Sequence, residues 1–238
     1  GTALVEDSIA EAVDFRRAMR EVGVNYHDWW FTVWGPDKLP EEGYGTQADW
    51  MLKSNDDWHG FGDVAEGFNM LDPIKGTIVT PGLSVKGDFA DTGIPAAVVT
   101  KDLSEHGIIV EKTGLYSFFI MFTIGITKGR WNTMVTELQQ FKDAYDANAP
   151  LWHVMPKFIA AFPAYENLGL RDLCQQIHEV YRSYDVARLT TQMYTSEMIP
   201  AMRPTDAYAK FAHGEVDRLP IDELEGRVSA VLLTPYPP

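Results

Sequence analysis

The stretch from residue 107 to residue 138 constrains the fold most, because it joins a long apolar run to a long helical pattern. It begins Gly107-Ile-Ile-Val-Glu-Lys-Thr-Gly114 and continues as Leu115-Tyr-Ser-Phe-Phe-Ile-Met-Phe-Thr-Ile-Gly125. A run of β-branched and aromatic residues bounded by glycines is typical of a strand that is buried on both faces. The sequence therefore predicts a central strand here, followed directly by a helix.

Two opposite charges, Glu111 and Lys112, interrupt this stretch beside the Ile-Ile-Val run at 108–110, which is suited to burial. Charges next to a buried strand cost free energy unless solvent or a partner compensates them. Either the pair emerges into solvent at a turn formed by Thr113 and Gly114, or it belongs to a binding site. The residues alone leave both interpretations open.

Helical and strand patterns alternate over the first 148 residues. Apolar residues at spacings of three and four predict helices, and β-formers between turn residues predict strands. The predicted elements are a helix at 8–20, a strand at 27–34, a strand at 70–80, a helix at 93–107, two strands within 107–125 and a helix at 127–148. This order fits an α/β (α+β) class fold, in which helices cover one face of a small sheet as a split βαβ-like layer.

After Pro150 the pattern changes to short helices. The predicted elements are helices at 151–162, 170–184, 186–194 and 204–213, then strands at 216–219 and 228–234 around an acidic turn. The change of character predicts two domains, residues 1–148 and residues 149–238.

Composition limits the partners and the compartment of the chain. A formal net charge of −14 over 238 residues argues against nucleic acid, whose phosphates would be repelled. The six histidines are scattered without ligand spacing, which argues against a metal site. Cys174 is the only cysteine, so a buried thiol in a reducing compartment is expected. With no leader and no apolar run long enough to span a bilayer, we expect a cytoplasmic protein without a membrane segment.

Five short blocks are spread along the chain. They are Trp58-His-Gly-Phe61, Leu71-Asp-Pro-Ile-Lys75, Gly93-Ile-Pro-Ala-Ala97, Gly107-Ile-Ile-Val-Glu-Lys-Thr-Gly114 and Pro235-Tyr-Pro-Pro238. In order and spacing they resemble the C-terminal part of the bacterial pyridoxal-phosphate-dependent ornithine/lysine/arginine decarboxylases, over essentially the whole chain. The resemblance implies the small domain of the aspartate-aminotransferase-type fold, followed by an incomplete, mostly helical C-terminal decarboxylase domain.

The same resemblance implies pyridoxal phosphate as the cofactor, with its covalent anchor elsewhere. In this family the anchoring lysine lies in a Ser-x-His-Lys context, and the cofactor acts as the electron sink. The residues that follow the six histidines here are Asp28, Gly60, Gly107, Val154, Glu179 and Gly214. No His-Lys pair exists, so we expect a segment that starts after the cofactor-binding domain, needs that upstream domain as its partner and is inactive alone.

Glu111 matches, by the resemblance, the glutamate that contacts the distal amine of the substrate in lysine-type members. Such a carboxylate should lie in a partly desolvated pocket. Lys112 is then either the charge partner of Glu111 or a solvated neighbour, and Thr113 in the same motif favours lysine over ornithine or arginine. Trp58 and His59 are candidates for residues near the site, although a histidine beside aromatic residues is more often a hydrogen-bonded structural residue.

Two functions from different classes follow. The first is a segment of a lysine decarboxylase that releases carbon dioxide and leaves cadaverine, with ornithine or arginine as alternative substrates. Apolar surface left by the missing domain predicts a homo-oligomer. The second is a non-catalytic α/β module that binds a small ligand or a partner subunit.

Overall fold

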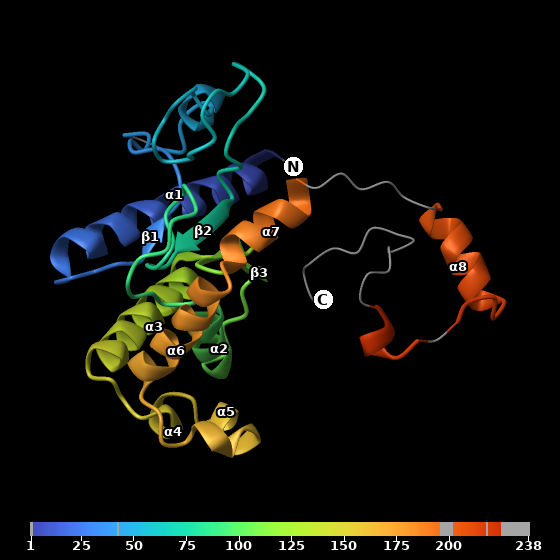
Figure 1. Cartoon of the computed structure of the whole chain (residues 1–238). Helices are drawn as coiled ribbons and strands as arrows, with labels where there is room; N and C mark the ends of the chain where they lie inside the picture. The colour runs from blue at the N-terminus through green and yellow to red at the C-terminus, as the bar shows by residue number, and fades with distance from the viewer. Residues whose placement is uncertain (1, 42, 196–201, 218, 225–238) are drawn as a thin grey trace. The chain divides into compact units, whose positions relative to one another are not determined.

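The structure is a computed structural model that describes residues 2–41, 43–195, 202–217 and 219–224. It forms two compact units, Gly1–Asp185 and Val186–Pro238 (Figure 1). Within the described ranges, no helix combines the length and the apolar character that crossing a membrane requires.

A four-stranded antiparallel sheet lies at the centre of the first unit. Its strands are β1 (Thr32–Val33), β2 (Lys75–Val79), β3 (Lys112–Thr113) and β4 (Ser117–Met121), arranged in the order β1-β2-β4-β3. Ile78 of β2 lies opposite Phe118 of β4, and both side chains are buried. Because side chains alternate along a strand, this pair marks the face of the sheet that carries the core.

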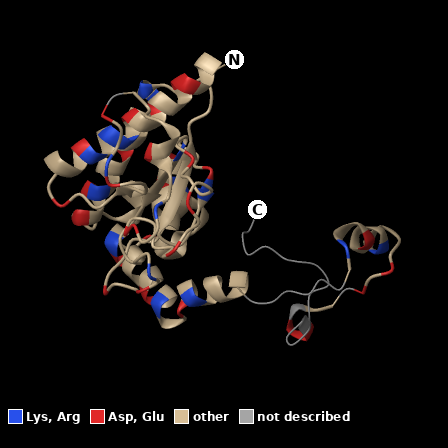
Figure 2. Cartoon of the chain, turned by 90° about the horizontal axis from the view of Figure 1, so that it is seen from above, with Lys and Arg blue, Asp and Glu red and all other residues tan. Residues whose placement is uncertain are grey.

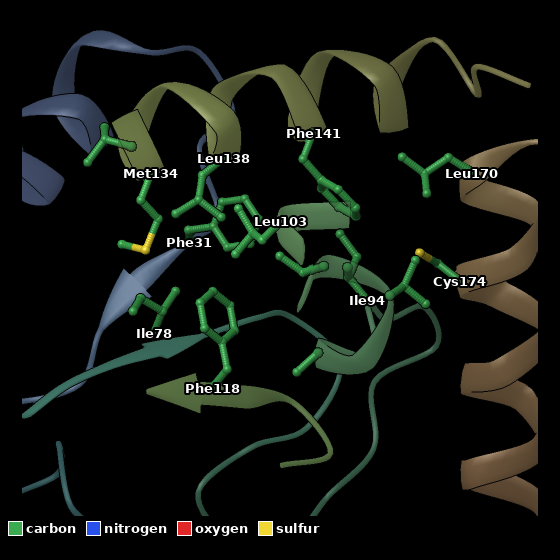
Figure 3. Packing of buried hydrophobic residues seen from close by; sticks show 14 of the residues in the cluster. Phe31, Ile78, Ile94, Leu103, Phe118, Met134, Leu138, Phe141, Leu170 and Cys174 are labelled. Atoms are coloured by element: carbon green, nitrogen blue, oxygen red, sulfur yellow. The ribbon is translucent and has the colours of Figure 1, made fainter. Parts of the chain in front are cut away.

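Helices α1 (Thr2–Asn25), α2 (Ala96–Glu105) and α3 (Lys128–Asp146) pack on this face. Figure 3 shows α3 over β2 and β4, with Leu138 and Phe141 directed toward Phe118 and with Leu103 of α2 between the layers. Trp131, Met134, Leu138 and Phe141 recur at spacings of three and four and are all buried. The apolar stripe that predicted α3 is therefore the surface that it presents to the core.

Further helices complete both units. The first unit also contains η1 (Gln47–Trp50), α4 (Leu151–Val154), α5 (Pro156–Ala161), η2 (Pro163–Tyr165) and α6 (Leu170–Ser183). The second unit contains α7 (Val186–Thr195), α8 (Pro204–Ala212) and η3 (Ile221–Leu224). The helix predicted at 151–162 is divided at Pro156, because proline lacks the N–H that a continuous helix needs and starts a new first turn instead.

Two of the predicted strands are shorter in the structure, and one does not form at its described positions. The strand predicted at 27–34 is reduced to β1, because α1 continues to Asn25 and a turn follows it. The strand predicted at 70–80 is reduced to β2. No strand forms at the described positions of 216–219, and the strand predicted at 228–234 lies outside the described residues. The predicted order of strand, helix, strand, strand, helix is confirmed by β2, α2, β3, β4 and α3.

The expectation of a strand buried on both faces was also wrong for this chain. Only Phe118 of β4 is fully buried, whereas Phe119, on the opposite face, is half-buried. The run at 108–110 is not a strand, and Ile109 is 88% exposed. Helices cover one face of the sheet, so alternation along the chain directs every second side chain away from the core.

The first unit extends well beyond residue 148. Leu151, Leu170 and Cys174 belong to the same buried cluster as Phe118 and Leu138. An isolated bridge between Pro150 and Gly169 and the packing of α6 on α3 connect this segment to the sheet domain. The compact units therefore differ from the predicted ranges 1–148 and 149–238, which stay a prediction about the domains of a longer protein.

Candidate functional site

The distribution of charged residues does not identify a functional site in the first unit. Figure 2 shows lysine and arginine residues interspersed with aspartate and glutamate along the helices of the first unit. Among the described residues, no group of three or more histidine, cysteine, aspartate or glutamate side chains is placed to hold a metal ion. The predicted residues and the cavities that they line therefore define the candidate site.

Glu111 lies directly before β3, at the edge of the sheet. Its backbone N–H donates to the carbonyl oxygen of Phe119 over 2.9 Å, which continues the ladder between β3 and β4. The Glu111 side chain lines a cavity of about 610 Å³, which we call the Glu111 cavity. Its walls include the apolar residues Ile108, Ile120 and Met134, and also His106 and Arg130. This surrounding is suited to the carbon chain of a ligand, with a carboxylate at one edge.

The burial expected for Glu111 is not present in this chain, where its side chain is exposed. The cavity is lined by the C-terminal cap of α2, residues 107–111, the end of β4 with the loop after it and the start of α3, and it opens to solvent. A partly desolvated carboxylate would require further protein to cover this opening.

Lys112 and Thr113 form β3 but lie on different faces of the sheet. Thr113 lies opposite the buried Phe118, and its hydroxyl donates to Oγ1 of Thr100 in α2 over 3.2 Å. Lys112 lies opposite Phe119 and is exposed. The structure therefore brings Glu111 and Thr113 toward the helical layer and directs Lys112 to the other side.

Trp58 and His59 lie in a loop between β1 and β2. His59 is buried, its Nε2 lies 2.8 Å from the carbonyl oxygen of Lys53, and its Nδ1 accepts the N–H of Phe61 over 3.0 Å. Trp58 packs edge-on against Trp34 at 4.9 Å between ring centroids. Both His59 nitrogens are thus used inside the loop, an arrangement that matches the structural interpretation of this histidine. A location near a substrate stays a prediction.

A second histidine, His178 of α6, forms a buried link to the sheet. Its Nδ1 accepts a hydrogen bond from the Tyr116 hydroxyl over 2.6 Å, and its Nε2 donates to the carbonyl oxygen of Ala90 over 3.0 Å. A side chain on Gly93 would come within 2.2 Å of that Nδ1, so this close approach requires glycine. The link fixes α6 against the loop before α2.

Sequence reasoning missed one cluster of ionisable residues, Asp102, His106 and Glu137, which we call the acid triad. Asp102 and His106 are one turn apart on α2 and its C-terminal cap, and Glu137 faces them from α3. Burial raises the pKa of the Asp102 carboxyl to about 7, an effect that His106 opposes and the charges of Glu137 and Glu105 reinforce. The spacing of Asp102 and His106 was visible in the sequence, but the position of Glu137 depends on how α3 packs.

Comparisons with known proteins decide the family. Residues 1–130 match the family model described as "Orn/Lys/Arg decarboxylase, major domain", and residues 187–238 match "Orn/Lys/Arg decarboxylase, C-terminal domain". The chain belongs to the Orn/Lys/Arg decarboxylase family. The predicted resemblance is confirmed, and so is the mixed α/β fold with a small sheet and many helices.

Individual members of the Orn/Lys/Arg decarboxylase family align with the whole chain. The lysine decarboxylase LdcA of Pseudomonas aeruginosa is 49% identical over 100% of this chain and 32% of its own length. The inducible lysine decarboxylase of Escherichia coli strain K12 is 36% identical over 100% of this chain and 33% of its own length. The biodegradative arginine decarboxylase of the same strain is 32% identical over 100% of this chain and 34% of its own length.

Solved structures of the family agree with the fold. Lysine decarboxylase A from Pseudomonas aeruginosa gives a TM-score of 0.85 at 49% identity, with 99% of this chain and 32% of that chain covered. The constitutive lysine decarboxylase of E. coli gives 0.85 at 35% identity, with 97% of this chain and 32% of that chain covered. The chain thus spans about a third of the length of the relatives that it matches.

Proposed function

We propose that this chain is part of a lysine decarboxylase, which converts lysine to cadaverine and carbon dioxide with pyridoxal phosphate. The observation that carries the proposal is the 49% identity, along the whole chain, to a relative named lysine decarboxylase. Relatives named for arginine and ornithine are less similar, at 32% and 34% identity. The proposed setting is the cytoplasm, and the proposed partners are an upstream cofactor-binding domain and further copies of the same protein.

The residues of this chain do not themselves fit the cofactor. Covalent attachment of pyridoxal phosphate requires a lysine amine, and of the described residues that line the Glu111 cavity none is a lysine. No histidine of the chain is followed by lysine, as the family's anchor would be. We therefore assign the cofactor to the upstream domain.

Incubation of the 238-residue chain with pyridoxal phosphate tests this assignment. We expect no absorbance of a bound cofactor beyond the weak signal that exposed surface lysines give. After reduction with borohydride, mass spectrometry should find the label at low occupancy on several lysines. One stoichiometric adduct on a single lysine would show that the chain carries an anchor of its own.

The proposed role of this chain is to recognise the side chain of the substrate. Lysine presents four methylene groups and a distal ammonium. In the Glu111 cavity, the apolar part of the wall suits the methylene groups and the carboxylate at the edge suits the ammonium, whereas His106 and Arg130 line other parts of the wall. Thr113 stays a prediction as a second substrate contact, because its hydroxyl is engaged with Thr100 here.

The proposed association with other protein is supported by exposed apolar side chains. Phe68 and Ile109 are 86% and 88% exposed in this chain. Apolar side chains that are this accessible suit a surface that the upstream domain or a second copy would cover. Sedimentation of the complete gene product would show whether it is an oligomer.

The complete gene product should be assayed for release of carbon dioxide from lysine, ornithine and arginine side by side. We expect the largest kcat/KM for lysine, by at least about tenfold, which corresponds to about 1.4 kcal/mol of differential binding in the transition state. A preference for ornithine or arginine would change the substrate but keep the reaction.

A second candidate is a non-catalytic α/β module that binds a ligand or a subunit. The absence of any His-Lys pair from these 238 residues is the observation that favours it. A gene without an upstream Ser-x-His-Lys sequence, together with no decarboxylation of any of the three amino acids, would favour this candidate.

A further inference from the structure

Two carboxylate oxygens of the acid triad are buried without a hydrogen bond. Oδ1 of Asp102 and Oε2 of Glu137 expose essentially no surface to solvent, and neither has a hydrogen-bond partner among the described residues. Both approach the same atom, Nδ1 of His106, at 3.8 Å and 3.7 Å. Because Oδ1 of Asp102 is cut off from solvent and from hydrogen-bond donors, a negative charge on Asp102 is costly, and the nearby carboxylate of Glu137 adds to that cost.

Because these two oxygens are buried, only a very small group can reach them and supply the missing hydrogen bond. A cavity of about 490 Å³ adjoins the triad, but a ligand inside it could not touch oxygens that have no accessible surface. A proton, in contrast, can bind to an oxygen that a ligand cannot reach. The side chain of His106 is 42% exposed, and its Nδ1 lies 3.0 Å from the backbone carbonyl oxygen of Asp102, so the imidazole connects the triad to solvent.

The other charged groups around the triad are engaged elsewhere or face solvent. Glu105 of α2 accepts the backbone N–H groups of Lys157 and Phe158 in α5. Asp143 of α3 accepts a hydrogen bond from the hydroxyl of Tyr26, the residue that follows α1. His153 of α4 lines the adjoining cavity and is exposed. None of these four elements brings a lysine or arginine into contact with the two unpaired oxygens among the described residues.

We propose that Asp102, His106 and Glu137 form one proton-binding site, whose occupied state holds the C-terminal end of α2 against α3. When the proton leaves, the two carboxylates repel each other across the interface between the helices. The site is a pH-sensitive contact built into the fold, and it goes beyond the decarboxylase activity proposed above.

Residues 107–111, which follow His106, should become less well held when the acid triad loses its proton. Residues 107–111 lead directly from His106 to Glu111, and the N–H of Ile108 donates to the carbonyl oxygen of Leu103 in α2 over 2.9 Å. His106 lines both the cavity beside the triad and the Glu111 cavity. A looser end of α2 therefore loosens the segment that positions Glu111.

The sign of the effect follows from the Asp102 pKa, which is about 7 in the folded chain against an ordinary value of 3.8. A raised pKa means that the folded arrangement binds the proton more tightly than the opened one. The contact is therefore strongest at low pH and weakens as the pH rises through about 7. In the closed state the end of α2 contacts α3, and in the open state this contact is broken. Proton linkage predicts that the ratio of closed to open molecules falls roughly tenfold between pH 6 and pH 8.

Hydrogen exchange of the complete gene product, followed by mass spectrometry at pH 6 and pH 8, tests the proposal. After correction for the intrinsic exchange rate at each pH, we expect protection of the amides in 107–111 to fall by about tenfold from pH 6 to pH 8. Asp102→Asn, which is neutral at both pH values, should show equal protection at both. Glu66→Gln, which removes an exposed carboxylate from a distant loop, should behave as the wild type.

Equal protection of the wild type at the two pH values would overturn the proposal. So would an Asp102→Asn protein that retains the tenfold change. If Asp102→Asn does not fold, Glu137→Gln replaces it, and the change should then shrink to about threefold or less, because one repelling charge is gone. Retention of the full change in Glu137→Gln would also overturn the proposal. Since exchange needs no turnover, the result is independent of whether the protein decarboxylates lysine.

Discussion

Replacing Glu111 with glutamine in the complete gene product should raise KM for lysine by about one to two orders of magnitude. Glutamine keeps the shape of the side chain but loses the charge that pairs with the distal ammonium of the substrate. A hydrogen bond to a charged group is worth about 1.5–3 kcal/mol, and about 1.4 kcal/mol corresponds to a factor of ten. Steady-state kinetics with lysine would measure the change.

The size of this effect depends on the rest of the protein. Glu111 is exposed in this chain, and an exposed ion pair contributes only about 0–1 kcal/mol. A loss of tenfold or more therefore requires that further protein covers the Glu111 cavity. Glu66→Gln is the matched control, because it removes an exposed glutamate charge without touching this cavity. An unchanged KM in Glu111→Gln would exclude this carboxylate from substrate binding.

Replacing Phe118 with alanine should lower the free energy of unfolding of the first unit by about 3–5 kcal/mol. Phe118 is 1% exposed and lies opposite Ile78, beneath α3 (Figure 3). The substitution removes a large apolar surface and leaves a void that two strands and a helix cannot fill. Because domains are typically stable by about 5–15 kcal/mol, this one change takes a large share of the total.

Phe119→Ala is the control for this prediction, because the two residues are adjacent in β4 but face opposite sides of the sheet. Phe119 is half-buried, so its loss should cost clearly less than that of Phe118. Urea unfolding of the two variants of this chain, followed by tryptophan fluorescence, would compare them. Equal losses would mean that the two faces of β4 are buried alike, contrary to the arrangement described here.

The hydrophobic patterns of the sequence predicted where helices and strands occur more accurately than they predicted how long these elements are. The stripe from Trp131 to Phe141 determined α3 because one helix face carries nearly all of its burial. The strand at 27–34 was predicted too long, because four aromatic residues raise strand propensity while also suiting a packed turn. Here Trp29 and Trp30 both pack against Phe31 before β1 begins, and Trp30 and Phe31 also pack against Phe141.

Only the residues of the candidate site that lie in a family motif could be predicted from the sequence. Glu111 was found because it lies in a recognisable motif, and the structure places it at a cavity. Its exposure could not be predicted, since that depends on which faces of the sheet are covered. The acid triad was missed for a related reason: Glu137 meets Asp102 only through the packing of α3 on α2.

The extent of the first unit determines where this chain can be shortened. Figure 3 shows Cys174 of α6 beside Ile94, with Leu170 one turn away on the same helix, and His178 of this helix accepts a hydrogen bond from the Tyr116 hydroxyl. A truncation at residue 148 would expose that flank of the interior to water and deprive the tyrosine of its acceptor. The smallest fragment that keeps the sheet domain intact therefore ends at or after Ser183, the last residue of α6.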